Sequence, residues 1–129
     1  MDLDKYFKDT KGTGFLATAN GEGRVAAAVY ARPHVMDPET VAFIMPDRLT
    51  HNNLQSNNHA TYLFMEQGTG YKGVRLQLTK VREETEGDLI QAIRQGKYAA
   101  ECGEEKNCFF LVYFKVDKIL PLIGARGSL

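Results

Sequence analysis

A short polar segment of the sequence combines a cation, a hydroxyl and an amide directly after an apolar strand candidate. The apolar run over residues 41–45 ends at Pro46, and Arg48, Thr50 and Asn53 follow it. We expect Thr50 to be the N-cap of a short helix, because threonine hydroxyls accept hydrogen bonds from backbone N–H groups at helix starts. The free N–H groups and positive dipole end of a helix start favour anions. With the Arg48 guanidinium nearby, the segment is suited to a phosphate.

A simpler interpretation of the same residues stays open at this point. Thr50 can cap an ordinary surface helix while Arg48 is solvated, since capping threonines are common in proteins. Asn53 can likewise be only a turn or cap residue. The order of the surrounding elements has to decide between the two interpretations.

Other chemistry has little support in the sequence. His51 and His59 would lie about 12 Å apart along a continuous helix, and no third ligand is spaced to complete a metal site. Cys102 and Cys108 do not form a Cys-x-x-Cys motif, and we expect reduced, unreactive thiols. No nucleophile motif, phosphate-binding loop or carboxylate pair is present, so we expect no catalytic side chain and no metal.

The composition is that of a single globular domain spanning residues 1–129. Hydrophobic residues make up 43% of the chain, and 16 basic residues balance 16 acidic ones. A formal net charge of zero gives no basic surface for nucleic acid or an anionic membrane, so neither partner is expected. The charged N-terminus is unlike a secretory signal, which favours a cytoplasmic protein. The near-neutral charge also mildly favours self-association.

The pattern of apolar residues predicts six strands and one clear helix. The segment at residues 74–84 begins with a strict alternation of apolar and polar side chains over residues 74–79, as expected of a half-buried strand. Pro33 lies within an extended segment and indicates a sheet edge or a bulge there. The helix is expected over residues 85–102 and a shorter one at the N-terminus. The expected strands cover residues 13–20, 24–36, 41–45, 60–67, 74–84 and 108–122. Consecutive antiparallel strands of this kind usually close into a barrel or sandwich.

This order of elements resembles the FMN-binding split barrel of the pyridoxamine 5′-phosphate oxidase-like family. Members often carry a Ser/Thr-x-Lys-x-x-Asn-Leu segment that grips the flavin phosphate. Here Asn53 and Leu54 occupy the Asn-Leu positions, Thr50 stands in place of the lysine, and Arg48 in place of the hydroxyl residue. "YKGVRLQLTKVREE" resembles the family's Gly-x-x-Leu strand, and "FKVDKILPL" resembles its final strand. In size the chain is similar to the small FMN-binding proteins.

The resemblance implies a mainly β fold, a six-stranded antiparallel split β-barrel of Greek-key type with short helices. It also implies a homodimer that holds FMN in the groove between two copies. From one copy, the implied cofactor-binding residues are Ala27, Ala28, Val29, Met45, Arg48, Leu49, Thr50 and Asn53. From the second copy they are Tyr71, Lys72, Gly73 and Leu122. Ordinary structural roles remain open for several of them, such as small strand residues or a half-buried tyrosine, and Arg32 is either a phosphate contact or a surface charge.

Two classes of function follow from the resemblance. The first is a flavoprotein oxidoreductase, in which FMN carries electrons between a small-molecule or protein donor and an acceptor. The alternative is a non-catalytic module that stores or carries flavin, or that binds haem or a deazaflavin. A structural dimer without a cofactor is a third interpretation, although it leaves the polar segment and the glycine-containing loop near residue 70 without a purpose.

Overall fold

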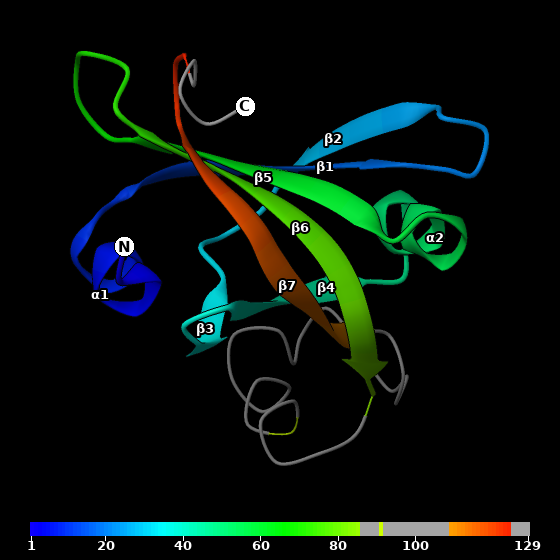
Figure 1. Cartoon of the computed structure of the whole chain (residues 1–129). Helices are drawn as coiled ribbons and strands as arrows, with labels where there is room; N and C mark the ends of the chain where they lie inside the picture. Colours follow the sequence, from blue (N-terminus) through cyan, green and yellow to red (C-terminus); the bar gives the residue numbers. More distant parts are fainter. Residues whose placement is uncertain (86–90, 92–108, 125–129) are drawn as a thin grey trace.

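The computed structural model describes residues 1–85 and 109–124, together with Gln91. Within these residues the chain forms one antiparallel sheet of seven strands and the helices α1 and α2 (Figure 1). The helix predicted over residues 85–102 falls almost entirely outside the described residues, as do Cys102 and Cys108. In chain order the elements are α1 (Leu3–Asp9), β1 (Gly12–Ala19), β2 (Val25–Val29), β3 (His34–Asp37), β4 (Thr40–Pro46), α2 (Leu49–Ser56), β5 (His59–Glu66), β6 (Gly73–Glu84) and β7 (Phe109–Pro121).

The predicted mainly β, antiparallel fold is confirmed, with seven strands in place of the expected six. The difference lies in residues 24–36, which the sequence suggested as one extended segment. The structure divides them into β2 and β3, separated by residues 30–33. Pro33 lies at this break and has no N–H to donate to a strand ladder. Both strands lie at edges of the sheet, whose order is β2-β1-β5-β6-β7-β4-β3, so the edge indicated by Pro33 is confirmed.

The two edge strands, β2 and β3, follow one another in the chain, so the sheet has to be rolled up. Only residues 30–33 connect β2 at one edge to β3 at the other. Five Cα–Cα steps span at most about 18 Å, whereas a flat sheet of seven strands would place its edges about 29 Å apart. The strong twist and curl of β5, β6 and β7 in Figure 1 bring the edges closer. The result is the split barrel.

The inner face of the rolled sheet holds a core rich in aromatic rings. Phe43, Tyr62 and Phe114 are almost fully buried. The ring centroid of Phe43 lies 4.9 Å from that of Tyr62 and 5.8 Å from that of Phe114. Burial of such rings, together with their tilted and edge-to-face contacts, stabilises the rolled sheet.

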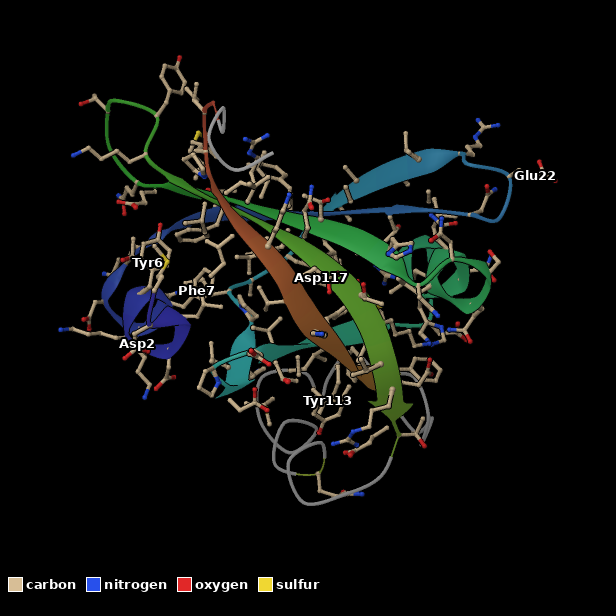
Figure 2. The ribbon with its side chains drawn as sticks, viewed as in Figure 1. Asp2, Tyr6, Phe7, Glu22, Tyr113 and Asp117 are labelled. Atoms are coloured by element: carbon tan, nitrogen blue, oxygen red, sulfur yellow. The ribbon has the colours of Figure 1, made fainter. Side chains whose placement is uncertain are left out.

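Helix α1 covers one end of the barrel. The Asp2 carboxylate caps it by accepting a hydrogen bond from the N–H of Lys5 at 3.2 Å. Leu3 and Phe7 are the buried residues of this helix, and Figure 2 shows Phe7 between the helix and the sheet. The ring of Phe7 packs edge-on against Phe64, with centroids 5.4 Å apart. The helix therefore extends the aromatic core beyond the sheet.

Candidate binding pocket

A pocket of about 360 Å³ opens between β2, β4 and the start of α2. Among the described residues, its lining includes two arginines and a histidine but no carboxylate, so its electrostatic potential favours an anionic ligand. The remaining wall is mostly apolar, which suits a ring system. The lining residues are Ala26, Ala27, Ala28, Val29, Tyr30, Ala31, Arg32, His34, Phe43, Ile44, Pro46, Arg48, Leu49 and Thr50.

Strand β2 offers unpaired backbone groups to this pocket. The N–H of Tyr30 donates to the Gly14 carbonyl of the β1 side at 2.9 Å. Because backbone groups alternate in direction along a strand, the N–H and C=O of Ala28 also face β1, and those of Ala27 and Val29 face the other way. No strand of the described sheet pairs with β2 on that side. The backbone groups of Ala27 and Val29 are thus available to a ligand, whereas those of Ala28 are turned toward β1.

Helix α2 lines the pocket with its first residues. Pro46 ends β4, and the N–H of Arg48 donates to the Pro46 carbonyl at 2.9 Å, forming a tight turn. The helix begins at Leu49 with Arg48 as its N-cap, so the prediction that Thr50 is the N-cap is wrong. The tight turn starts the helix two residues earlier than expected. No cap hydrogen bond from the Arg48 side chain is made, and the N–H groups of the first turn have no partner inside the helix.

The Thr50 side chain bonds with Tyr30 instead of capping the helix. The Tyr30 ring packs edge-on against Phe43, with centroids 6.0 Å apart. Its hydroxyl is hydrogen-bonded to Thr50 and lies near the charge of Arg48. Burial raises the pKa of Tyr30, while the bond to Thr50 and the charge of Arg48 offset part of that rise. Tyr30 is therefore a neutral phenol at ordinary pH.

Arg48 is exposed and has no salt-bridge partner among the residues that the structure describes. The neighbouring carboxylate of Asp47 instead lies 3.7 Å from Nδ1 of His51. A free guanidinium can bind a phosphate through two parallel hydrogen bonds. Together with the hydroxyls of Tyr30 and Thr50 and the start of α2, Arg48 makes this end of the pocket chemically suited to a phosphate group.

Two of the predicted cofactor-binding residues, Met45 and Asn53, face the core rather than the pocket. Met45 is fully buried among the inner-face residues, and its neighbours Ile44 and Pro46 line the pocket in its place. The alternation of side chains along β4 explains this correction. Asn53 is 3% exposed, and its amide donates a hydrogen bond to the Thr18 hydroxyl at 3.1 Å. Asn53 therefore ties α2 to β1 and lies outside the pocket lining.

Arg32 has a structural partner that neither sequence interpretation anticipated. Its Nη1 atom donates to the carbonyls of Phe7 and Thr10, at 2.7 and 2.8 Å. These carbonyls lie at the C-terminal end of α1, where a cation is favourable. Arg32 contributes positive charge to the pocket wall, but its guanidinium holds α1 against the connection between β2 and β3.

The remaining predicted residues lie together elsewhere in the structure. The N–H of Leu122 donates to the Gly73 carbonyl at 3.2 Å, which joins the end of β7 to the start of β6. The backbone carbonyl of Lys72 accepts a hydrogen bond from the N–H of Glu66 at 2.8 Å. Tyr71 is 71% exposed and has a φ of 51°, a strained value for a residue with a side chain. We call the β2–α2 pocket the first half-site and residues 71–73 with Leu122 the second half-site.

The two half-sites of one chain lie on different strands. Val29 in the wall of the first half-site pairs with Phe15, which pairs in turn with Leu63 on β5. Leu63 pairs with Arg75, two residues after Gly73, so β2 and β6 are three strand spacings, about 14 Å, apart at this level of the sheet. Figure 1 shows α2 and the β5–β6 loop at opposite ends of the sheet. The structure thus brings six of the predicted residues together in the first half-site and four in the second.

Sequence reasoning missed Tyr30, His34 and Ile44 as pocket residues. For Tyr30 a signal existed, because it follows Ala26 and Ala28 at the two-residue spacing of a strand. His34 had no such signal, since its place depends on how the chain crosses between the sheet edges. Desolvation lowers the pKa of His34, which keeps its imidazole neutral at ordinary pH.

Solved structures share this fold. An FMN-binding protein from Syntrophomonas wolfei superposes with a TM-score of 0.73 at 17% identity, covering 97% of this chain and 86% of that chain. A pyridoxamine 5′-phosphate oxidase-like protein from Lactobacillus delbrueckii gives 0.68 at 14% identity, covering 92% and 89%. HutZ, a haem storage protein from Vibrio cholerae, gives 0.66 at 16% identity, covering 92% of both chains.

These similarities show that the chain has the split-barrel fold of FMN-binding and pyridoxamine 5′-phosphate oxidase-like proteins, as the sequence resemblance predicted. The same fold occurs in a haem storage protein, so fold alone does not fix the ligand. No protein-family model matches the sequence, and a comparison with curated proteins finds no significant match. Among the described residues, no helix is long and apolar enough to cross a membrane.

Proposed function

We propose that this protein binds FMN in the first half-site and uses it to pass electrons between a small-molecule or protein donor and an acceptor. The observation that carries the proposal is the pocket lining, which combines the free start of α2 and an Arg48 that has no salt-bridge partner in the described part of the chain with a long apolar wall. A phosphorylated ring compound matches both parts. Bound FMN would supply the redox chemistry, and the protein would bind it, orient it and exclude water.

The polar end of the pocket supports one orientation of FMN. Its phosphate would bind Arg48 and Thr50, and its ring would lie along the free edge of β2. The backbone N–H groups of Ala27 and Val29 would then donate to polar atoms at the edge of the ring. Such preorganised donors stabilise negative charge that develops on a ligand during reduction.

A second copy of the chain would complete the site. Apolar side chains beside the first half-site are unusually exposed, with Val25 at 77%, Val29 at 72% and Leu49 at 59%. Tyr71 and Ile123, near the second half-site, are 71% and 67% exposed. In a dimer with two-fold symmetry, each first half-site can meet the second half-site of the other copy, because such interfaces are reciprocal. Both exposed surfaces would then be buried together.

Haem binding is the second candidate, and His34 is the observation that favours it. Its imidazole lines the pocket and is neutral, which is the form that ligates iron. Haem also carries carboxylates that could bind Arg48. Titration with haemin would give a His34-dependent absorption band if haem is the ligand, whereas a preference for FMN would leave His34→Ala with unchanged ligand binding.

The phosphate end of the pocket gives the most direct mutational test of the proposal. The double variant Arg48→Ala/Thr50→Ala removes a charge-assisted bond and a hydroxyl, and should weaken FMN binding by about 2–4 kcal/mol. Flavin fluorescence quenching during titration measures the affinity. Lys5→Ala/Thr13→Ala is the matched control, since it removes an exposed cation and an exposed threonine outside the pocket lining. Equal FMN affinity in the double variant and the wild type would show that the phosphate binds elsewhere.

A further inference from the structure

His51 lies in the first turn of α2 but outside the pocket lining, buried against β6 and β7. It is 7% exposed, and its ring stacks on Phe110 with centroids 3.7 Å apart and planes 10° apart. Its Nε2 atom lies 2.9 Å from Oε2 of Glu83. Because an ionised carboxylate only accepts hydrogen bonds, Nε2 is the donor. One side chain thus fixes the first turn of α2 to the two neighbouring strands.

Glu83 is itself held firmly as the acceptor. Lys80 Nζ lies 2.5 Å from its Oε1 atom, and Gln55 Nε2 donates to the same atom at 3.2 Å. Burial alone would raise the pKa of Glu83, but the hydrogen bonds from Lys80, His51 and Gln55 outweigh burial and lower it to about 2. Glu83 is therefore ionised at ordinary pH. Gln55 also donates to the backbone carbonyl of His51 at 3.1 Å, which links the two turns of α2 within the same cluster.

The start of α2 needs such support. The helix has only eight residues, and helices of this length are unstable without contacts to the rest of the protein. Leu54 and Asn53 anchor its second turn in the core and on Thr18. In the first turn, the pocket-facing anchor is the bond between Thr50 and Tyr30, and His51 anchors the turn from the side of β6 and β7.

We propose that His51 is a positioning residue for the phosphate end of the pocket, and that its hydrogen bond to Glu83 sets where Arg48 and the free N–H groups of α2 meet a phosphate. The inference rests on the proposed function. It predicts an effect on the binding of FMN but not of riboflavin, because in the proposed orientation only the phosphate of FMN would contact this end of the pocket. FMN and riboflavin share the ring and differ by the phosphate, so the ratio of their affinities reports the position of the first turn.

Two substitutions of His51 separate hydrogen bonding from packing. His51→Phe keeps a ring on Phe110 but removes the donor to Glu83. His51→Gln removes the ring but keeps an amide donor near the position of Nε2. We expect the preference for FMN over riboflavin to fall about tenfold in His51→Phe, the order expected when a charge-assisted contact is misaligned. Riboflavin affinity should stay unchanged, and His51→Gln should retain most of the preference.

Further variants keep the test decisive. Glu83→Ala removes the same bond from the β6 side without changing the sequence of the helix, and it also removes the acceptor of Gln55 and Lys80. It should lower the preference as His51→Phe does, even if His51→Phe does not fold. Tyr6→Phe is the control for general stability, since it removes the 2.6 Å bond from Tyr6 to Glu66 at the α1 end of the molecule. It should leave the preference unchanged.

The outcomes distinguish the inference from the function it rests on. A wild-type protein with no preference for FMN over riboflavin would overturn the proposed phosphate site and the role of His51 with it. A wild-type preference that survives in both His51→Phe and Glu83→Ala would overturn only the positioning role. A larger loss in His51→Gln than in His51→Phe would also overturn it, because packing on Phe110 would then be what matters.

Discussion

At the scale of the residue, the pocket is distinguished by polar groups that have no partner of opposite charge. Arg48 forms no salt bridge among the described residues, while the nearby Glu83 has three hydrogen-bonding partners. A cation without a carboxylate is free to bind an anionic ligand, whereas a carboxylate satisfied by several donors is part of the framework. This difference distinguishes residues that could bind a ligand, such as Arg48, from residues that support the fold around the pocket, such as Glu83.

The low pKa of Glu83 predicts a pH dependence of folding. An unfolded glutamate titrates near 4.5, whereas the folded group titrates near 2. The network therefore stabilises the fold fully above about pH 4.5 and loses that contribution as the pH falls toward 2. After allowance for solvent screening, we expect a contribution on the order of 1–2 kcal/mol. Chemical denaturation between pH 5 and pH 2 measures it.

Glu83→Gln is the variant that checks this assignment. Its free energy of unfolding should vary less than that of the wild type between pH 5 and pH 2, because the titrating group is gone. Parallel pH profiles of the two proteins would show that another carboxylate is responsible.

Part of the site was predictable, Arg48 and Thr50 from their residue types and the others from the family resemblance. Ala27, Ala28 and Val29, like Arg48, Leu49 and Thr50, do line one pocket. The side-chain direction of Met45 was not predictable, because residues 41–45 are apolar throughout and show no alternation that would mark the inner face. The core position of Asn53 depends on a partner, Thr18, that lies 35 residues earlier in the chain. No local pattern encodes that contact.

At the scale of the element, the site depends on where strands begin and end. The predicted segments at residues 41–45, 60–67 and 74–84 correspond to β4, β5 and β6. A short apolar run marks the first, alternation marks the start of the third, and turn residues bound all three. The position at which residues 24–36 divide into β2 and β3 was not predictable, because Tyr30 and Ala31 continue the apolar pattern of β2. What ends β2 is the crossing to the other sheet edge, a property of the whole barrel.

Gly73 at the start of β6 is an element boundary with a strict steric requirement. Its φ is 157°, and a Cβ there would lie 2.0 Å from the backbone oxygen of Phe64. Gly73→Ala should therefore destabilise the protein by about 2 kcal/mol or more, since backbone atoms have to move. Thermal and denaturant unfolding measure the loss.

Gly21→Ala is the matched control for this prediction. A Cβ at Gly21 would meet Ser56 at an ordinary 3.5 Å, so the change should be neutral to within about 0.5 kcal/mol. Similar stability of the two alanine variants would contradict the steric account of the β5–β6 hairpin.

At the scale of the whole molecule, we propose that a second copy of the chain completes the site. Within one copy the two half-sites lie on different strands, and each lies beside exposed apolar side chains. The sequence suggested this arrangement only through its resemblance to a family, because composition and periodicity carry no information on which surfaces meet. The exposed apolar side chains beside both half-sites give the arrangement a physical basis that can be tested.

Mixing two defective variants tests whether the site is shared. Arg48→Ala/Thr50→Ala alters the first half-site, and Tyr71→Ala/Lys72→Ala alters the second. Each variant alone should bind FMN weakly. If they are unfolded together and refolded, mixed dimers should restore about a quarter of the tight sites, because each mixed dimer contains one site built from two intact halves. Titration with FMN counts them, and no recovery in a mixture shown to contain mixed dimers would place the whole site within one chain.

The measurement that tests the central claim most directly is the visible absorption spectrum of the purified protein, before and after addition of FMN, with its mass in solution. We predict a yellow dimer that holds one FMN per chain and whose flavin band stays with the protein through gel filtration. A protein that remains colourless after FMN is added and the free ligand removed would contradict the claim.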